Sequence, residues 1–253
     1  MNIAVVTGAS SGMGREFALQ LDKENLDEIW ILARRLNRLK ELEVNMKTPV
    51  RCLEIDLLDP KQVIDYVNML KEVKPDVRYL VNASGLGIFG NYDEVSMSDE
   101  MHMIDLNIKT VVEMTKNTLP YMSAGSMVIQ LASSASFVPI PNQNVYSSSK
   151  AFVTNYSRAL NYELKPRNIT VTAVCPGWVR TEFFNHVKAD KAPHAPVKYW
   201  PIADAGDVVS LALKDAKKGK KVSVYGFIMN AFRALCKICS HDFVCKNMVR
   251  IQK

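Results

Sequence analysis

The 253-residue chain has only five cysteines and no uninterrupted apolar stretch long enough to span a bilayer. Arg233 and Lys237 interrupt the most apolar candidate stretch. The first residues also lack the basic start and separate apolar region of a secretory signal peptide. We therefore expect a cytoplasmic protein whose thiols are free.

The sequence also lacks a large charge of one sign. Its 32 Lys and Arg against 26 Asp and Glu give a net charge of +6, which is too small for the basic stripe that nucleic-acid binding needs. Apolar residues make up 48% of the chain and charged residues 23%, a balance typical of a globular protein. Neither a disordered chain nor a nucleic-acid partner is predicted.

No metal-binding pattern is present. The C-terminal group of Cys236, Cys239, His241 and Cys245 is too compressed for the separated ligand pairs of a zinc site, so its cysteines are interpreted as small apolar residues of a helix. Three further histidines have no partner pattern and are expected at the surface: His102, His186 and His194.

Short apolar runs alternate with amphipathic stretches along the chain. The runs, expected to be strands covered on both faces, are Ile3–Val6, Ile29–Leu32, Val50–Ile55, Leu80–Val81, Met127–Leu131, Val171–Val174 and Val222–Val224. The stretches, expected to be helices, are Arg15–Lys23, Arg35–Asn45, Gln62–Val73, Met101–Met122 and Ala151–Leu164. This alternation predicts an α/β fold with a doubly wound parallel sheet in one domain, residues 1–226. Residues 182–205, which hold aromatic residues among three prolines, are expected to form a long loop or lid.

A glycine-rich turn follows the first expected strand. Gly8, Gly12 and Gly14 permit a tight turn and a close backbone approach to a pyrophosphate, and the next helix offers its N-terminal N–H groups to phosphates. A dinucleotide site is therefore favoured over an ordinary turn. After the second strand, Ala33 stands where an NAD site usually has an acid, and Arg34 offers a forked donor for a 2′-phosphate. This favours NADP(H); the alternative is that Arg34 is a solvated charge at a helix start.

A third group of residues suggests acid–base chemistry. Tyr146 and Lys150 would share one face of a helix that starts near Tyr146, and a nearby ammonium would lower the pKa of the phenol. Tyr146 is then a candidate general acid or base, and Ser133 a candidate donor to a carbonyl oxygen. By itself the Tyr146–Lys150 spacing favours an ordinary exposed helix pair.

Taken together, these motifs resemble those of the short-chain dehydrogenase/reductase family over about residues 2–226. The segment Leu80–Gly85 is similar to the family's Asn-Asn-Ala-Gly motif, with Ala83 and Ser84 as departures. Further matches are the adenine-contacting acid, the proton-relay asparagine and the loop on the nicotinamide side, at Asp56, Asn107, and Pro176-Gly177 with Thr181.

The resemblance implies a sheet of about seven strands, a Rossmann fold, and hydride transfer between nicotinamide and a carbonyl carbon without a metal. Lys150 would also bind the nicotinamide ribose, and Asn107 would orient a water that reprotonates Tyr146. The implied catalytic residues are Asn107, Ser133, Tyr146 and Lys150. The implied NADP(H) site comprises Thr7, Gly8, Ser10, Ser11, Gly12, Met13, Gly14, Arg34, Asp56, Leu57, Asn82, Gly85, Tyr146, Lys150, Pro176, Gly177, Val179 and Thr181.

The expected substrate pocket is apolar. Its candidate walls are residues 86–89 and 137–140 and four lid aromatics, which suits a lipophilic ketone such as a steroid. The ending Tyr225-Gly226 and the tail are faintly similar to those of 17-beta-type hydroxysteroid dehydrogenases. The alternatives are a 3-oxoacyl-thioester reductase and a non-catalytic NADP(H)-binding protein. The lid aromatics are Phe183, Phe184, Tyr199 and Trp200.

Two surfaces are expected to make contacts. The resemblance implies a homodimer or homotetramer that pairs through the helices over Met101–Met122 and Ala151–Leu164. The apolar and basic extension, residues 227–253, has a net charge of +4, with apolar positions at helical spacing. It is expected to pack on the protein or close the pocket; contact with an anionic membrane is the alternative. The positions are Ile228, Phe232, Leu235 and Cys239.

Overall fold

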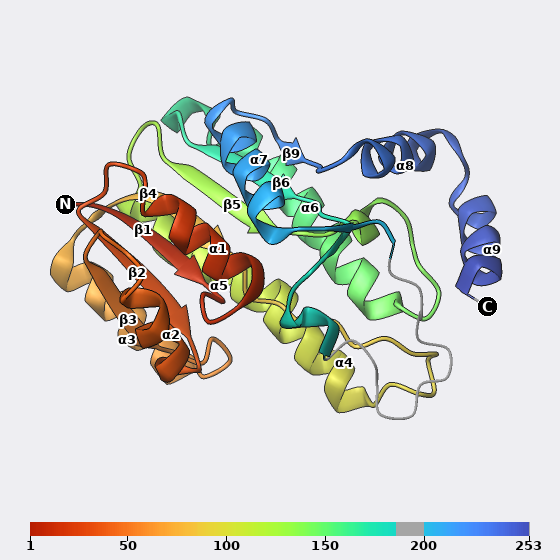
Figure 1. Cartoon of the computed structure of the whole chain (residues 1–253), viewed down its shortest axis with the longest axis horizontal. Helices are drawn as coiled ribbons and strands as arrows, with labels where there is room; N and C mark the ends of the chain where they lie inside the picture. Colours follow the sequence, from red (N-terminus) through yellow and green to blue (C-terminus); the bar gives the residue numbers. More distant parts are fainter. Residues whose placement is uncertain (186–199, 253) are drawn as a thin grey trace.

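The computed structural model describes residues 1–185 and 200–252, and strands alternate with helices along the chain (Figure 1). The strands are β1 (Asn2–Thr7), β2 (Glu28–Ala33), β3 (Val50–Glu54), β4 (Asp76–Asn82), β5 (Met127–Leu131), β6 (Thr170–Val174), β7 (Trp178–Val179), β8 (Ile202–Ala203) and β9 (Val222–Ser223). The α-helices are α1 (Gly12–Leu21), α2 (Leu36–Glu43), α3 (Pro60–Val73), α4 (Met97–Ile104), α5 (Thr110–Thr118), α6 (Asn144–Glu163), α7 (Ala205–Lys217), α8 (Phe227–Ile238) and α9 (His241–Gln252).

Seven strands form one parallel sheet in the order β3-β2-β1-β4-β5-β6-β9, which confirms the doubly wound fold. After β1 the chain builds outward through β2 and β3, then returns to place β4 on the other side of β1. This reversal opens a crevice at the carboxyl ends of β1 and β4, which is where doubly wound sheets bind ligands.

Alternate residues of each strand enter two different cores. In β1, Ala4 and Val6 pack with buried residues of α1, α2 and α7, whereas Ile3 and Val5 pack with residues of α3, α5 and α6. Because helices cover both faces, the strands are apolar along nearly their whole length, which explains why they are visible as continuous apolar runs. The sheet is therefore a rigid base for the loops at its carboxyl edge.

Local signals set the starts of the helices beside this edge. At α3, the Asp59 carboxylate accepts a hydrogen bond from the Lys61 N–H at 2.9 Å, and Pro60 occupies the first helical position. At α4, the Ser96 hydroxyl accepts from the Asp99 N–H at 3.1 Å. The helix expected over Met101–Met122 is divided, because a π-helical turn separates α4 from α5.

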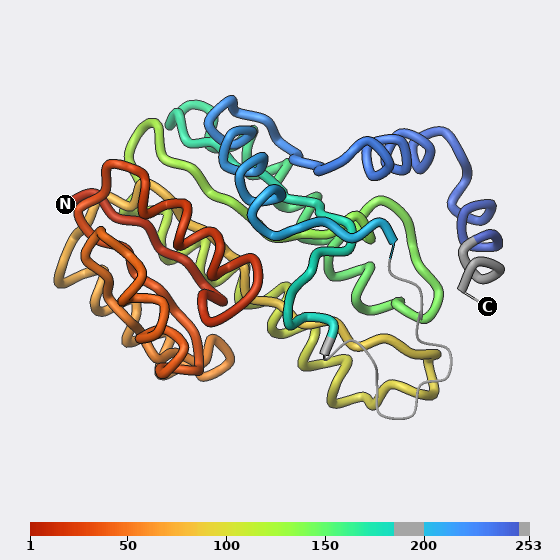
Figure 2. The backbone as a smooth tube through the Cα atoms, viewed as in Figure 1, coloured from red at the N-terminus to blue at the C-terminus, as the bar shows by residue number. Residues whose placement is uncertain are grey.

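The C-terminal extension forms α8 and α9, which lie at the end of the molecule opposite the N-terminus (Figure 2). The expected packing face is wrong in part: Phe232 and Cys239 pack against the protein, but Ile228 and Leu235 are exposed. The reason is the rotation of α8, which directs Cys236 inward instead. Within residues 1–185 and 200–252, no helix combines the length and apolar character needed to cross a membrane.

Candidate active site

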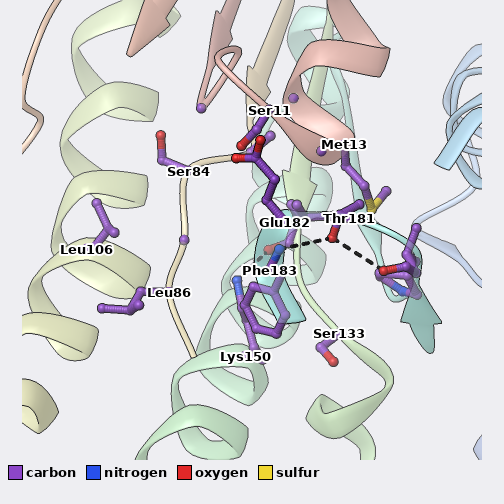
Figure 3. A pocket seen from close by; sticks show the side chains of 18 of the residues that line it. Ser11, Met13, Ser84, Leu86, Leu106, Ser133, Lys150, Thr181, Glu182 and Phe183 are labelled. Atoms are coloured by element: carbon purple, nitrogen blue, oxygen red, sulfur yellow. Dashed lines mark hydrogen bonds between the residues drawn. The ribbon is translucent and has the colours of Figure 1, made fainter. Parts of the chain in front are cut away.

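A cavity of about 950 Å³ lies at the carboxyl edge of the sheet. It runs from the loops after β2 and β3, across the glycine turn after β1, to α6 and the start of α8. In Figure 3, Ser11 and Met13 enter from the glycine turn and α1, while Lys150 enters from α6 on the opposite side. The cavity thus joins the two motifs that sequence analysis identified separately.

The glycine turn is packed too tightly for side chains. Gly8 has φ +67°, and a Cβ built there would lie 2.8 Å from the Ser84 amide nitrogen. A Cβ on Gly14 would lie 2.3 Å from the Gly8 carbonyl oxygen, so α1 begins directly against the turn. The Thr7 hydroxyl accepts hydrogen bonds from the N–H groups of Ala83 and Ser84, at 3.1 and 3.2 Å, and joins the turn to the loop after β4. The backbone is consequently open to a ligand on its cavity side.

The N-terminus of α1 faces this cavity. Ser11, its N-cap, makes no side-chain hydrogen bond to the described residues of the helix, and no acidic residue lies in the first turn. The Glu182 side chain extends from the loop after β7 toward Ser11 (Figure 3). A carboxylate thus lies where a helix N-terminus attracts anions.

Arg35 holds that carboxylate. Its guanidinium donates to Glu182 at 3.1 Å and to the Ser10 hydroxyl at 3.1 Å, and Arg38 stands 4.0 Å from the same carboxylate. These contacts, the hydrogen bond to Arg35 foremost, hold the pKa of Glu182 below its usual range. Arg34 also lines the cavity but is exposed, and it makes no hydrogen bond or ion pair with residues 1–185 and 200–252. Two arginines therefore flank the end of the cavity beside β2.

The catalytic candidates meet at the other end. Tyr146 and Lys150 lie four residues apart on the buried face of α6, and Ser133 follows β5. The Tyr146 hydroxyl lies beside that of Ser133, which accepts a hydrogen bond from the Ala135 N–H at 3.1 Å. The Lys150 ammonium donates to the Leu131 carbonyl oxygen at 2.9 Å. The two hydroxyls thus lie together among mostly apolar side chains.

Burial controls the protonation of this group. Burial raises the pKa of Tyr146 to about 12, and the neighbouring Ser133 hydroxyl offsets this only in part. Burial also lowers the pKa of Lys150 to about 8. The expectation that Lys150 lowers the pKa of Tyr146 is therefore wrong for this arrangement. The lysine nitrogen lies 5.9 Å from the phenol ring centre and points to Leu131, so burial dominates.

Asn107 lies in the π-helical turn between α4 and α5 and is fully buried. Its side-chain oxygen accepts from the Leu86 N–H at 2.9 Å, and its amide donates to the Leu86 carbonyl at 2.8 Å and to the Ser149 hydroxyl at 3.0 Å. It does not line the cavity. Its contacts fix the loop after β4 to α6; the relay role stays a prediction.

Aromatic rings pack against the ring of Tyr146. The centres of the Phe89 and Tyr146 rings are 5.1 Å apart in an edge-to-face contact, and the Phe183 ring lies 5.9 Å away. Phe89 is fully buried and does not line the cavity, unlike Leu86 and Ile88 of the same loop. Of the predicted wall 86–89, Leu86 and Ile88 thus line the cavity, whereas Phe89 packs against Tyr146 instead.

Most predicted cofactor residues line one cavity, and two do not. Thr7 joins the turn to the loop after β4, and Asn82 donates to Thr115 and Gln130 inside the protein. The lining members of the predicted set are Gly8, Ser10, Ser11, Gly12, Met13, Gly14, Arg34, Asp56, Leu57, Gly85, Tyr146, Lys150, Pro176, Gly177, Val179 and Thr181.

The substrate walls need several corrections. Of residues 137–140 only Ile140 lines the cavity, because Phe137 and Val138 turn into the packing beneath it and Pro139 is exposed. His102, expected at the surface, lines the cavity, as do Phe183, Phe184 and Trp200 of the predicted lid. Tyr199, His186 and His194 lie outside the described residues. Lining residues that sequence analysis missed include Arg35, Gln143, Trp178, Glu182 and Met229, and Phe232 of the extension also lines the cavity.

No metal site accompanies this arrangement in the described part of the chain, where no group of three or more His, Cys, Asp or Glu could hold an ion. The glycine turn, the uncapped helix and the Ser–Tyr–Lys group define an oxidoreductase of the nucleotide-binding α/β class. The model of the short-chain dehydrogenase family matches residues 2–192, so the chain belongs to that family.

Two curated relatives agree with this assignment. Sulfoacetaldehyde reductase 2 of Chromohalobacter salexigens is 36% identical over 191 residues, covering 72% of this chain and 74% of its own. A probable NADP-dependent dehydrogenase of Haemophilus influenzae is 35% identical, covering 72% and 73%.

Two solved structures share the fold at low identity. A short-chain dehydrogenase from Sphingobium yanoikuyae in complex with NADPH has a TM-score of 0.78 at 23% identity, covering 95% of this chain and 97% of its own. A Burkholderia phymatum enzyme in complex with NAD has a TM-score of 0.81 at 20% identity, covering 97% and 95%.

Proposed function

We propose that the chain is an NADP(H)-dependent enzyme that interconverts a lipophilic ketone and its secondary alcohol. One observation carries the proposal: the Tyr146 and Ser133 hydroxyls meet at the apolar end of a cavity whose other end holds Arg34 and Arg35. The relative from Haemophilus influenzae, described as NADP-dependent, supports the cofactor choice.

The residues at the phosphate end fit a dinucleotide. Gly8 and Gly14 let the turn pack against its neighbouring backbone, where a Cβ would collide, and both line the cavity. The N-terminus of α1 offers N–H groups to a pyrophosphate there. Arg34 and Arg35 suit the additional 2′-phosphate of NADP(H), since no acid takes the place of Ala33. When bound, the nicotinamide supplies or accepts the hydride.

The chain's own residues handle the proton. In reduction, Tyr146 donates its phenolic proton to the carbonyl oxygen of the substrate, and the Ser133 hydroxyl donates a hydrogen bond to the same oxygen as charge develops there. Burial keeps the phenol protonated at neutral pH, which suits this acid role. Lys150 donates to the Leu131 carbonyl beside this pair and would also bind the nicotinamide ribose of the bound cofactor. In oxidation the proton moves the opposite way.

The substrate end favours apolar compounds. Its described walls include Ile88, Ile140, Phe183 and Met229, and the only ionisable wall residue besides Lys150 and Tyr146 is His102. A sulfonate such as that of sulfoacetaldehyde would need a firm cationic partner. The described walls offer only His102 and Lys150, whose ammonium is bonded to the Leu131 carbonyl. We therefore propose a lipophilic ketone, of which a steroid is one example, as the substrate class.

A substrate panel tests the proposal. Purified enzyme would be given NADPH or NADH with lipophilic ketones of increasing size, a 3-oxoacyl thioester and sulfoacetaldehyde, and cofactor oxidation would be followed by absorbance. We expect the highest kcat/KM for a lipophilic ketone with NADPH, and a large loss of turnover with the Tyr146→Phe control. A preference for the thioester or for sulfoacetaldehyde would contradict the substrate class. Cofactor binding without any turnover would favour a non-catalytic binding protein.

A further inference from the structure

The outer face of α8 is apolar and exposed. Phe227 is 88% exposed, Leu235 50% and Ile238 85%, and exposed Ala231 lies between them. The spacings of four, four and three residues place these side chains on one side of the helix. Phe243 at the start of α9 is 58% exposed and adds to the apolar surface. A row of exposed apolar side chains along one side of a helix favours an interaction site.

The inner face of the same helix belongs to the cavity. Met229 and Phe232 line it, and Cys236 is buried beneath. A Cβ on Gly177 of the cofactor-side loop would lie 2.6 Å from the Met229 sulfur. At 100° per residue, this face lies opposite the outer one. One helix thus separates the cavity wall from the exterior.

Basic residues accompany the apolar face. Lys237 and Lys246 are exposed, and Arg233 is half-buried against Phe137. Over residues 227–253 the sequence has five Lys and Arg against a single Asp, a net charge of +4. A two-fold contact of this face with a second copy would bring +4 against +4. A surface of anionic lipid instead complements both the charge and the apolar side chains.

We propose that α8 and α9 bind an anionic lipid surface through this outer face, with Phe227, Leu235 and Ile238 inserted at the headgroup level. The binding does not depend on the proposed function. Its consequence does: if the substrate is a lipophilic ketone, Met229 and Phe232 place the cavity wall one helix diameter from the lipid in which that ketone dissolves.

Sedimentation with vesicles tests this proposal. Full-length protein would be mixed with phosphatidylglycerol or phosphatidylcholine vesicles at low and high salt. The outer-face variant Leu235→Ser/Ile238→Ser would be compared with Val44→Ser/Ile64→Ser, which removes two equally exposed apolar side chains elsewhere. Lys237→Gln and Lys246→Gln would test the charges, and thermal melting would confirm folding.

We expect salt-sensitive binding to phosphatidylglycerol that the outer-face variant loses and the control keeps. Each lysine substitution should weaken binding roughly fivefold. Unchanged binding by the outer-face variant, or no binding by folded wild-type protein, would overturn the proposal. If the wild-type protein does not bind vesicles and light scattering gives the outer-face variant a smaller mass than the wild type, the face would be assigned to contact with a second copy. Reduction of a water-soluble ketone by that variant is expected to continue, which separates this proposal from the proposed function.

Discussion

Arg35 and Glu182 are 147 positions apart in the sequence, yet their side chains meet at 3.1 Å across the phosphate end of the cavity. The contact joins the loop after β2 to the loop after β7. It also places a carboxylate beside Ser11, near the helix N-terminus that would hold a pyrophosphate. Under the proposed function, Glu182 would compete with the cofactor for Arg35.

Removing this competition should tighten cofactor binding. Glu182→Gln frees Arg35, and because exposed ion pairs are worth ~0.2–1 kcal/mol, the Kd for NADPH should fall up to roughly fivefold. Fluorescence titration measures it, with Glu163→Gln on α6 as the control that removes an equal charge at a distance. Weaker NADPH binding by Glu182→Gln would show that the carboxylate positions Arg35 instead.

Arg34 should distinguish the two cofactors. A charge-assisted contact with phosphate is worth ~1.5–3 kcal/mol, so Arg34→Ala should weaken NADPH binding roughly ten- to over a hundredfold. NADH binding should change little, because NADH lacks the 2′-phosphate. Titrations of wild type and variant with both cofactors measure the difference. Equal affinity of the wild type for NADH and NADPH would refute the assignment.

Tyr146→Phe should remove the proton donor and keep the ring that contacts Phe89. Turnover of a good ketone should fall by ~10²–10⁴, the usual contribution of a general acid, whereas NADPH binding should persist. Steady-state kinetics and cofactor titration together measure this. Wild-type turnover by the variant would mean that another group supplies the proton.

Lys150 should make stability depend on pH. Burial lowers its pKa to about 8 from the usual 10.5, so between these values the unfolded chain holds a proton that the folded chain has released. The free-energy cost of burying the Lys150 ammonium has its full value below about pH 8 and vanishes above about pH 10.5. Lys150→Met should thus raise the free energy of unfolding at pH 7 by about 2 kcal/mol, since ~1.4 kcal/mol corresponds to one pKa unit and the lost bond to Leu131 offsets part.

Denaturant titration at pH 7 and pH 9.5 checks this sign. The stabilisation by Lys150→Met should be less than half as large at the higher pH. A gain that is constant with pH, or a loss at pH 7, would show that the ammonium is not penalised by burial.

Assembly should involve α4 and α6. Met97 and Met101 on α4 and Phe152 on α6 are exposed apolar side chains, and two-fold contacts between such faces are the commonest symmetric solution. We expect light scattering to give the mass of a dimer or tetramer, and Phe152→Glu to reduce it. A monomeric wild type at working concentration would exclude this interface.

Much of the fold follows from local patterns. Each strand of the main sheet was visible as an apolar run because both its faces are covered, and the run near Leu80 was too short only because Arg78 and Asp76 interrupt the apolar pattern. The Tyr146–Lys150 spacing likewise predicted a shared helix face, since α6 starts at Asn144. These features depend on neighbours in sequence.

Features that depend on tertiary packing could not be predicted. Helical spacing places Lys150 beside Tyr146 but does not encode that its ammonium turns to Leu131, so the pKa of the phenol was expected to shift the wrong way. The pairing of Arg35 with Glu182 and the inward side of α8 likewise depend on how distant loops and helices meet. The spacing of residues along the sequence does not indicate such contacts.

The contact between Phe89 and Tyr146 has a consequence for how the enzyme would fail. The ring of the proton donor is held by apolar neighbours, at 5.1 Å from Phe89 and 5.9 Å from Phe183, in the manner of a core residue. Phe89 in turn belongs to the same loop as Leu86, which Asn107 clamps to the body of the protein. The position of the Tyr146 ring therefore depends on apolar packing, and damage to this loop should slow turnover well before it unfolds the protein.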